Sequence, residues 1–103
     1  MIETIKKILG IRPPVDWKGL VENGAIIIDV RSKSEYNSGH ISGSQNIPLD
    51  TLATQFTKIP KGKIVIAVCA SGMRSASAKS ILVYNGFEAY NGGGWYGLQN
   101  KIG

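Results

Sequence analysis

Residues 63–75 read KIVIAVCASGMRS, and this stretch decides the fold. Its first part, 63–68, is a nearly continuous apolar run rich in β-branched side chains, which is typical of a strand buried on both faces. Cys69 follows directly, and the apolar pattern after it predicts a helix over about 74–85. A buried strand that turns into a helix is typical of a parallel sheet covered by helices.

The flanking sequence repeats this alternation of strands and helices. Residues 25–30 (AIIIDV) form another buried apolar run, and Asp16 is an N-cap candidate for the helix before it. The predicted elements in chain order are a helix at 17–23, a strand at 25–30, a helix at 33–38, a strand at 44–48, a helix at 49–56, a strand at 63–68, a helix at 74–85, a strand at 87–90 and a short helix from Trp95. This order predicts an α/β fold with a mainly parallel sheet.

The first residues show a different pattern. In 2–9 (IETIKKIL) the apolar side chains recur at helical spacing with charges opposite, and Gly10 and the Pro13-Pro14 pair end the pattern. We therefore expect an amphipathic N-terminal helix over 1–12, followed by one domain over 13–103.

Composition narrows the classes of protein. The 103 residues have the length of one domain, and 43% apolar with 18% charged residues is typical of a globular chain. No apolar run reaches the roughly 20 residues of a membrane span, and charged residues interrupt any secretory apolar region, so we expect a cytoplasmic protein. The net charge of +5 favours anionic partners. The basic residues are dispersed without interleaved aromatics, which argues against nucleic acid as a partner.

The cysteine and histidine counts restrict the chemistry further. Cys69 is the single cysteine, which excludes an internal disulfide, a CxxC redox pair and a multi-cysteine zinc site. His40 is the single histidine, which excludes a histidine-based metal cluster. We therefore expect no metal and no cofactor.

Cys69 lies where a buried strand ends and a turn leads into a helix. Unpaired N–H groups and the positive end of the helix dipole point at such a position, and they favour a thiolate. Gly72 can adopt the positive φ of an anion-binding loop, Ser71 adds a hydroxyl and Arg74 a positive charge. A lone cysteine at a strand end is also often a small buried apolar residue, but these neighbours favour an anion-binding loop.

Three segments resemble the rhodanese-like domain family. They are DVRSKSEYNSGHISGSQNIP (29–48), CASGMRS (69–75) and GGGWYGL (92–98), and the resemblance covers about residues 13–100. It implies a three-layer α/β domain in which a mainly parallel sheet of about five strands carries helices on both faces. The second segment resembles the six-residue active-site loop of the family.

The resemblance implies sulfurtransferase chemistry. The Cys69 thiolate would take the outer sulfur of a small anionic donor such as thiosulfate, and a thiophilic acceptor (cyanide, a thiol or a protein) would then remove it. The persulfide would lie among the backbone N–H groups of the loop, which comprises Ala70, Ser71, Gly72, Met73 and Arg74. Arg74 is the candidate for binding the donor's oxyanion, because a guanidinium can do so with two parallel hydrogen bonds.

Other motif residues are expected to have structural roles. Asp29 and Arg31 are interpreted as an ion pair or a cap at the end of their strand, and His40 as a structural histidine. The glycines at 92–94, with Trp95, are expected to let the last connection pass close to the Cys69 loop.

Two alternatives to a sulfurtransferase stay open. A cysteine phosphatase or arsenate reductase also pairs a reactive cysteine with arginine, but its signature has five residues between them, and here only four intervene between Cys69 and Arg74. A non-enzymatic sulfur carrier or regulatory binding module with the same fold is the second alternative. Many modules of that type have lost the cysteine that this chain retains.

Overall fold

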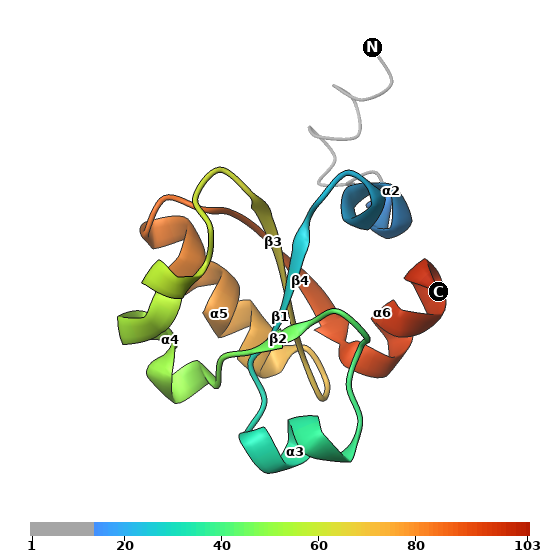
Figure 1. Ribbon diagram of the computed structural model, residues 1–103, viewed down its shortest axis with the longest axis horizontal. Coiled ribbons are helices and arrows are strands. Elements are labelled where there is room, and N and C mark those ends of the chain that lie inside the picture. Colours follow the sequence, from blue (N-terminus) through green and yellow to red (C-terminus); the bar gives the residue numbers. More distant parts are fainter. Residues whose placement is uncertain (1–13) are drawn as a thin grey trace, which may run out of the picture.

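The computed structural model describes residues 14–103. The helix expected over 1–12 lies outside this range, so that helix and the boundary of the following domain stay predictions. The described residues form a parallel sheet between helices (Figure 1).

Four strands form the sheet in residues 14–103, in the order β2-β1-β3-β4. Their bounds are β1 Ile26–Asp29, β2 Gln45–Asn46, β3 Ile64–Cys69 and β4 Glu88–Gly94. They correspond to the four runs that the sequence pattern itself identifies, and the fifth strand implied by the family resemblance is not found in this range. All neighbours pair in parallel, so the carboxyl ends of the strands meet at one edge of the sheet.

The first difference from the expected strands is the length of β2. It ends at Asn46 instead of 48. Pro48 has no N–H to continue a ladder, and it stands at the N-cap position of the helix that follows. The proline therefore ends the strand and starts the helix.

The second difference is that β4 continues through the glycines that were expected to form a connection. Its register against β3 shifts by one residue, because Ala67 pairs with Asn91 while Val68 pairs with Gly93. Gly92 is the extra residue of this β-bulge. The bulge brings Gly94 opposite Cys69, at the end of both strands.

The helices surround the sheet. They are α2 Trp17–Glu22, α3 Lys33–Ser38, α4 Leu49–Gln55, α5 Met73–Tyr84 and α6 Trp95–Ile102, with a 3₁₀ turn at Phe56–Lys58. Helices α4 and α5 pack on one face of the sheet and α2 and α6 on the other, as Figure 1 shows. The three-layer α/β fold is thus confirmed. None of these helices is both long and apolar enough to cross a bilayer.

The core explains why the strands are apolar throughout. Successive side chains of a strand point to opposite faces. Ile28 and Val65 pack in the core beneath α4 and α5, whereas Ile27 and Ile66 pack in the second core with Leu98 of α6. Because both faces are covered, the usual alternation of apolar and polar residues is absent.

Side chains that cap the helices explain where α2 and α3 begin. Asp16 Oδ1 accepts the N–H of Gly19 at 3.0 Å, which confirms the predicted cap. Ser32 and Glu35 form a reciprocal capping box, in which each side chain accepts the backbone N–H of the other residue. The capping box fixes Glu35 in the first turn of α3, close to the carboxyl edge of the sheet.

Candidate active site

Cys69 is the last residue of β3, and the predicted site is built at this edge of the sheet. The loop 70–72 connects it to α5, which begins at Met73, one residue earlier than predicted. Ala70 and Ser71 are exposed, and the Met73 side chain is 80% exposed. Cys69 itself is only 1% exposed and packs with the core beneath α5.

Polar groups surround the sulfur despite its burial. The N–H of Gly72 donates to Sγ at 2.9 Å, and Oγ of Ser75 lies 3.4 Å from Sγ. Burial raises the pKa of the Cys69 thiol. Hydrogen bonds from the Ser75 hydroxyl and from the N–H groups of Ser75, Gly72 and Ser71 lower this pKa by more than burial raises it, so it lies below its usual value. This environment favours a thiolate.

The lowered pKa predicts that Cys69 ionises at a lower pH than an unperturbed cysteine thiol. The thiolate can be followed by its ultraviolet absorbance, with the Cys69→Ser variant as the blank that subtracts the tyrosines. A midpoint at or above the value of a free thiol would contradict the hydrogen-bonding scheme described above.

Glycines allow the loop and β4 to approach each other. Gly72 has a φ of +103°, a conformation that other residues rarely adopt. A Cβ on Gly72 would lie 3.4 Å from Cα of Gly93, and one on Gly94 would lie 2.9 Å from the carbonyl oxygen of Ala70. The expectation that glycines 92–94 let the chain pass close to the Cys69 loop is confirmed.

The Arg74 side chain forms an ion pair with a residue from a distant part of the chain. Its Nη1 and Nη2 atoms donate to the two carboxylate oxygens of Glu35 at 2.7 and 3.0 Å. The Arg74 side chain donates to Glu35 and holds the pKa of that carboxyl at about 2, aided by the N–H of Ser32. The guanidinium fork predicted to bind a donor's oxyanion therefore faces a carboxylate in this structure.

Glu35 is not among the site residues predicted from the sequence. The available signal was local, since Ser32 followed three residues later by Glu35 is the pattern of a capping box. That pattern predicts the start of a helix and carries no information about Arg74, which is 39 residues away.

The Glu35–Arg74 pair predicts a pH-dependent stability. Because the pKa of Glu35 is about 2 in the folded chain and about 4.5 when unperturbed, the unfolded chain binds more protons between these values. The wild type should be slightly more stable than Glu35→Gln above pH 4.5, and the difference should vanish as the pH falls from 4.5 toward 2. Urea unfolding of both proteins between pH 2 and 7 measures it, and a difference that does not change with pH would contradict the prediction.

Asn91 of β4 is a second site residue that sequence analysis missed. Its Oδ1 accepts the Ser75 hydroxyl at 2.6 Å and the N–H of Gly93 at 2.9 Å, and its Nδ2 donates to the carbonyl of Gly72 at 3.1 Å. Asn91 therefore ties the loop and α5 to β4. Its proximity to Ser75 follows from the register between β3 and β4, which no local sequence pattern indicates.

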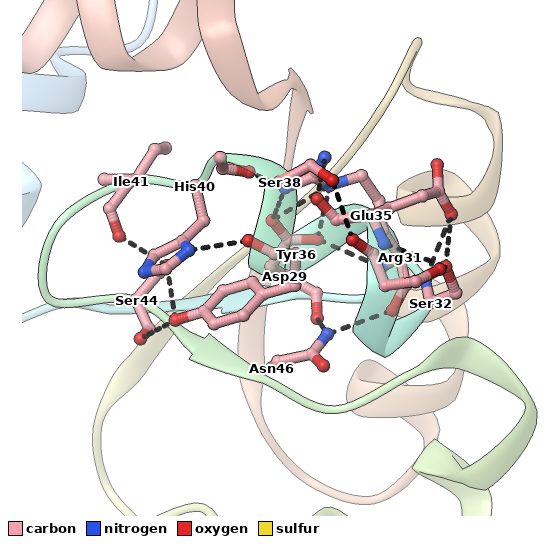
Figure 2. Close-up of polar contacts among 12 residues, drawn as sticks. Asp29, Arg31, Ser32, Glu35, Tyr36, Ser38, His40, Ile41, Ser44 and Asn46 are labelled. Atoms are coloured by element: carbon pink, nitrogen blue, oxygen red, sulfur yellow. Dashed lines mark hydrogen bonds and ion pairs between the residues drawn. The ribbon is translucent and has the colours of Figure 1, made fainter.

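Asp29 and Arg31 form the structural ion pair that was predicted. Nε and Nη2 of Arg31 donate to the Asp29 carboxylate at 2.8 to 3.1 Å, and Nη2 also donates to the carbonyl of Gly39 at 2.6 Å (Figure 2). The guanidinium carbon lies 4.8 Å from the ring centroid of Trp95. Asp29 is fully buried and Arg31 is 5% exposed, so the pair joins β1 to α6 and to the end of α3.

The structural interpretation of His40 is consistent with its contacts. Its ring stacks on Tyr36 with centroids 3.7 Å apart, and Nδ1 lies 2.7 Å from the carbonyl oxygen of Tyr36 (Figure 2). His40 therefore packs against α3. Over residues 14–103, no three side chains of the types His, Cys, Asp and Glu gather in a group that could bind a metal.

An open cavity of about 600 Å³ adjoins the Arg74 side of the site. The starts of α3 and α4 and the end of β1 form its walls, and its lining residues are Val30, Ser32, Lys33, Pro48, Leu49, Asp50, Thr51 and Arg74. The lining combines apolar residues with two cationic side chains and one carboxylate, at the edge of a parallel sheet where ligands usually bind.

Proteins named as sulfurtransferases are similar to this chain in sequence. The tRNA sulfurtransferase of Thermoplasma acidophilum is 35% identical over 83 residues, which are 80% of this chain and 16% of that protein. The thiosulfate sulfurtransferase GlpE of Pseudomonas fluorescens is 34% identical over 76 residues, which are 74% of this chain and 70% of that protein. This chain thus spans a small part of the first relative and most of the second.

Solved structures show the same fold. Reduced CoADR-RHD from Bacillus anthracis matches with a TM-score of 0.73 and 34% identity, over 94% of this chain and 18% of that one. A rhodanese with anions from E. coli matches with a TM-score of 0.66 and 33% identity, over 71% of this chain and 89% of that one. The family described as "Rhodanese-like domain" matches residues 9–101. The chain therefore belongs to the rhodanese-like domain family.

Proposed function

We propose that this protein is a sulfurtransferase that carries a sulfane sulfur on Cys69. The observation that supports the proposal most directly is the N–H of Gly72, which donates to Sγ at 2.9 Å in a loop of four residues between Cys69 and Arg74. The relatives named tRNA sulfurtransferase and thiosulfate sulfurtransferase support the same reaction class.

The reaction divides into two displacements at sulfur. The Cys69 thiolate attacks the outer sulfur of thiosulfate, the sulfur–sulfur bond of the donor breaks, and sulfite leaves with the bonding electron pair. The Cys69 persulfide then passes its outer sulfur to a nucleophilic acceptor, such as cyanide, a small thiol or a protein thiol. The acceptor's electron pair forms the new bond, and Cys69 is released as thiolate.

The residues of the loop supply what this chemistry needs. Sulfite is a stable anion, so no acid has to protonate the leaving group. The main requirement is stabilisation of negative charge on sulfur, and fixed N–H donors provide it without reorganisation. The open cavity beside Arg74, which Lys33 also lines, supports the approach of a small donor. A single reactive thiol also suits a reducing compartment such as the cytoplasm.

Intact-mass measurement tests the proposal. After incubation of the full chain with thiosulfate, we expect a species heavier by one sulfur atom. Cyanide should restore the original mass and yield thiocyanate. Loading and discharge without repeated turnover would indicate a sulfur carrier instead of an enzyme, and the absence of any loaded species would overturn the proposal.

The number of residues in the loop predicts that the protein is not a phosphatase, and this can be tested independently. Four residues between Cys69 and Arg74 form a narrower cradle than the five of a cysteine phosphatase. We expect no hydrolysis of a chromogenic aryl phosphate. Turnover comparable to that with thiosulfate would contradict the assignment.

A further inference from the structure

The hydroxyl of Ser75 lies between two groups that compete for its hydrogen. Ser75 is fully buried, and its Oγ is 2.6 Å from Oδ1 of Asn91 and 3.4 Å from Sγ of Cys69. An amide oxygen only accepts, so the hydrogen in the short contact must come from Ser75. In this structure the hydrogen therefore points at Asn91 and away from the sulfur.

Two further contacts fix the orientation of the Asn91 amide. The N–H of Gly93 donates to Oδ1, and Nδ2 donates to the carbonyl of Gly72. An amide turned by half a rotation would place donor against donor at Gly93 and acceptor against acceptor at Gly72. The oxygen of Asn91 is thus the atom that faces Ser75.

The N–H of Gly72 favours the thiolate, but this orientation of the Ser75 hydroxyl suits the protonated form of Cys69. Because the hydroxyl hydrogen of Ser75 points at Asn91, a lone pair of Ser75 Oγ faces the sulfur. This lone pair can accept the hydrogen of a thiol, but it repels the negative charge of a thiolate. To stabilise the thiolate, the hydroxyl must turn its hydrogen toward the sulfur and give up the bond to Asn91.

We propose that Asn91 is a positioning residue that competes with Cys69 for the single hydrogen of Ser75, so that ionisation of the thiol requires this hydrogen to turn from the amide to the sulfur. The assignment concerns the free thiol and needs no sulfur donor. Its consequence for sulfur loading rests on the proposed function, because there the same thiolate is the nucleophile.

Charged groups near the site do not produce the same effect. Arg74 of α5 is the cation that interacts with the charge of Cys69, and it is paired with Glu35 of α3. Asp29 of β1 is paired with Arg31. At its end near the sulfur, β4 contributes Asn91 and glycines, which do not titrate. These groups are the same in all the variants compared below, so they do not contribute to the differences between them.

A double-mutant cycle tests the proposal, with the ultraviolet titration of the Cys69 thiolate as the readout. Asn91→Leu removes the competing acceptor at similar volume, so we expect the midpoint to fall by about one pH unit, the scale of one neutral hydrogen bond. Ser75→Ala should raise the midpoint by a similar amount. In the Ser75→Ala background, Asn91→Leu should have no further effect, because no hydrogen remains to be released.

The sign of the shift separates positioning from a merely structural role. If Asn91 only holds the loop through Gly72 and Gly93, its loss should loosen the donors around the sulfur and raise the midpoint in both backgrounds. Either a rise or an equal shift with and without Ser75 would overturn the proposal. The titration needs no sulfur transfer, so its outcome is independent of the mass measurement.

A second variant covers the case in which Asn91→Leu does not fold. Asn91→Asp keeps an acceptor for Ser75 and adds a negative charge that raises the midpoint in any background. It also holds the Ser75 hydrogen more tightly. We therefore expect a larger rise with Ser75 present than in the Ser75→Ala background. Equal rises would contradict the competition.

Discussion

Cys69→Ser should abolish sulfur transfer from thiosulfate to cyanide. A serine hydroxyl cannot form the persulfide, and the chain has no second cysteine to replace the lost nucleophile. In a serine protease with a covalent intermediate, loss of the nucleophile costs on the order of 10⁶-fold in turnover. Thiocyanate formation should therefore fall to the uncatalysed rate, and the sulfur adduct should disappear from the intact-mass spectrum.

Ser77→Ala is the matched control for this variant. Ser77 is exposed on the same helix, α5, and takes no part in the site, so its loss should leave transfer and stability unchanged. Unfolding measurements on Cys69→Ser complete the comparison, because a serine of similar size can keep the contacts with Gly72 and Ser75. Residual transfer well above the uncatalysed rate in folded Cys69→Ser would disprove the role of Cys69.

Arg31→Met should destabilise the fold by about 3–5 kcal/mol, the usual cost of removing one partner from a buried ion pair. Asp29 is fully buried, and both of its oxygens accept hydrogen bonds from the Arg31 side chain. Without the guanidinium, that carboxylate would stay in the interior without its charged partner. The cation–π contact with Trp95 would also be lost. Urea unfolding at neutral pH measures the change.

Two companion variants identify the cause of that loss. Lys33→Met removes an exposed cation two positions away, and it should change stability by less than about 0.5 kcal/mol. The double variant Asp29→Asn/Arg31→Met removes the unpaired charge and should recover part of the loss. If Arg31→Met proves as mild as Lys33→Met, the ion pair does not hold the edge of the sheet together.

Local sequence patterns predicted the parts of this molecule that depend on local structure. The β-branched runs located β1 and β3, and the glycine and arginine after Cys69 indicated a loop leading into a helix. Asp16 predicted the start of α2. Each of these features depends on side chains within a few residues of one another, so one chain without an alignment is sufficient to find them.

The sequence did not reveal the contacts that complete the site. Glu35 reaches Arg74 across 39 residues, and Asn91 reaches Ser75 across 16. Such pairs depend on how the strands are ordered and on the register between them. The predicted β4 was too short because glycine ordinarily weakens a strand. In the structure the strand continues through glycines, since the Ile66 side chain leaves no room for a Cβ on Gly92 and the Ala70 carbonyl leaves none on Gly94.

The bulge at Gly92 limits how this domain can tolerate changes in length. Regular pairing after Asn91 would place Gly92 opposite Val68, and every later residue would then lie on the opposite face of the sheet. The Trp95 ring would then lose its contact with the guanidinium of Arg31, and α6 would begin on the wrong side of the sheet. We expect relatives to vary freely in the turns that precede β4, whereas the spacing between Asn91 and Trp95 can change only together with the position of the last helix.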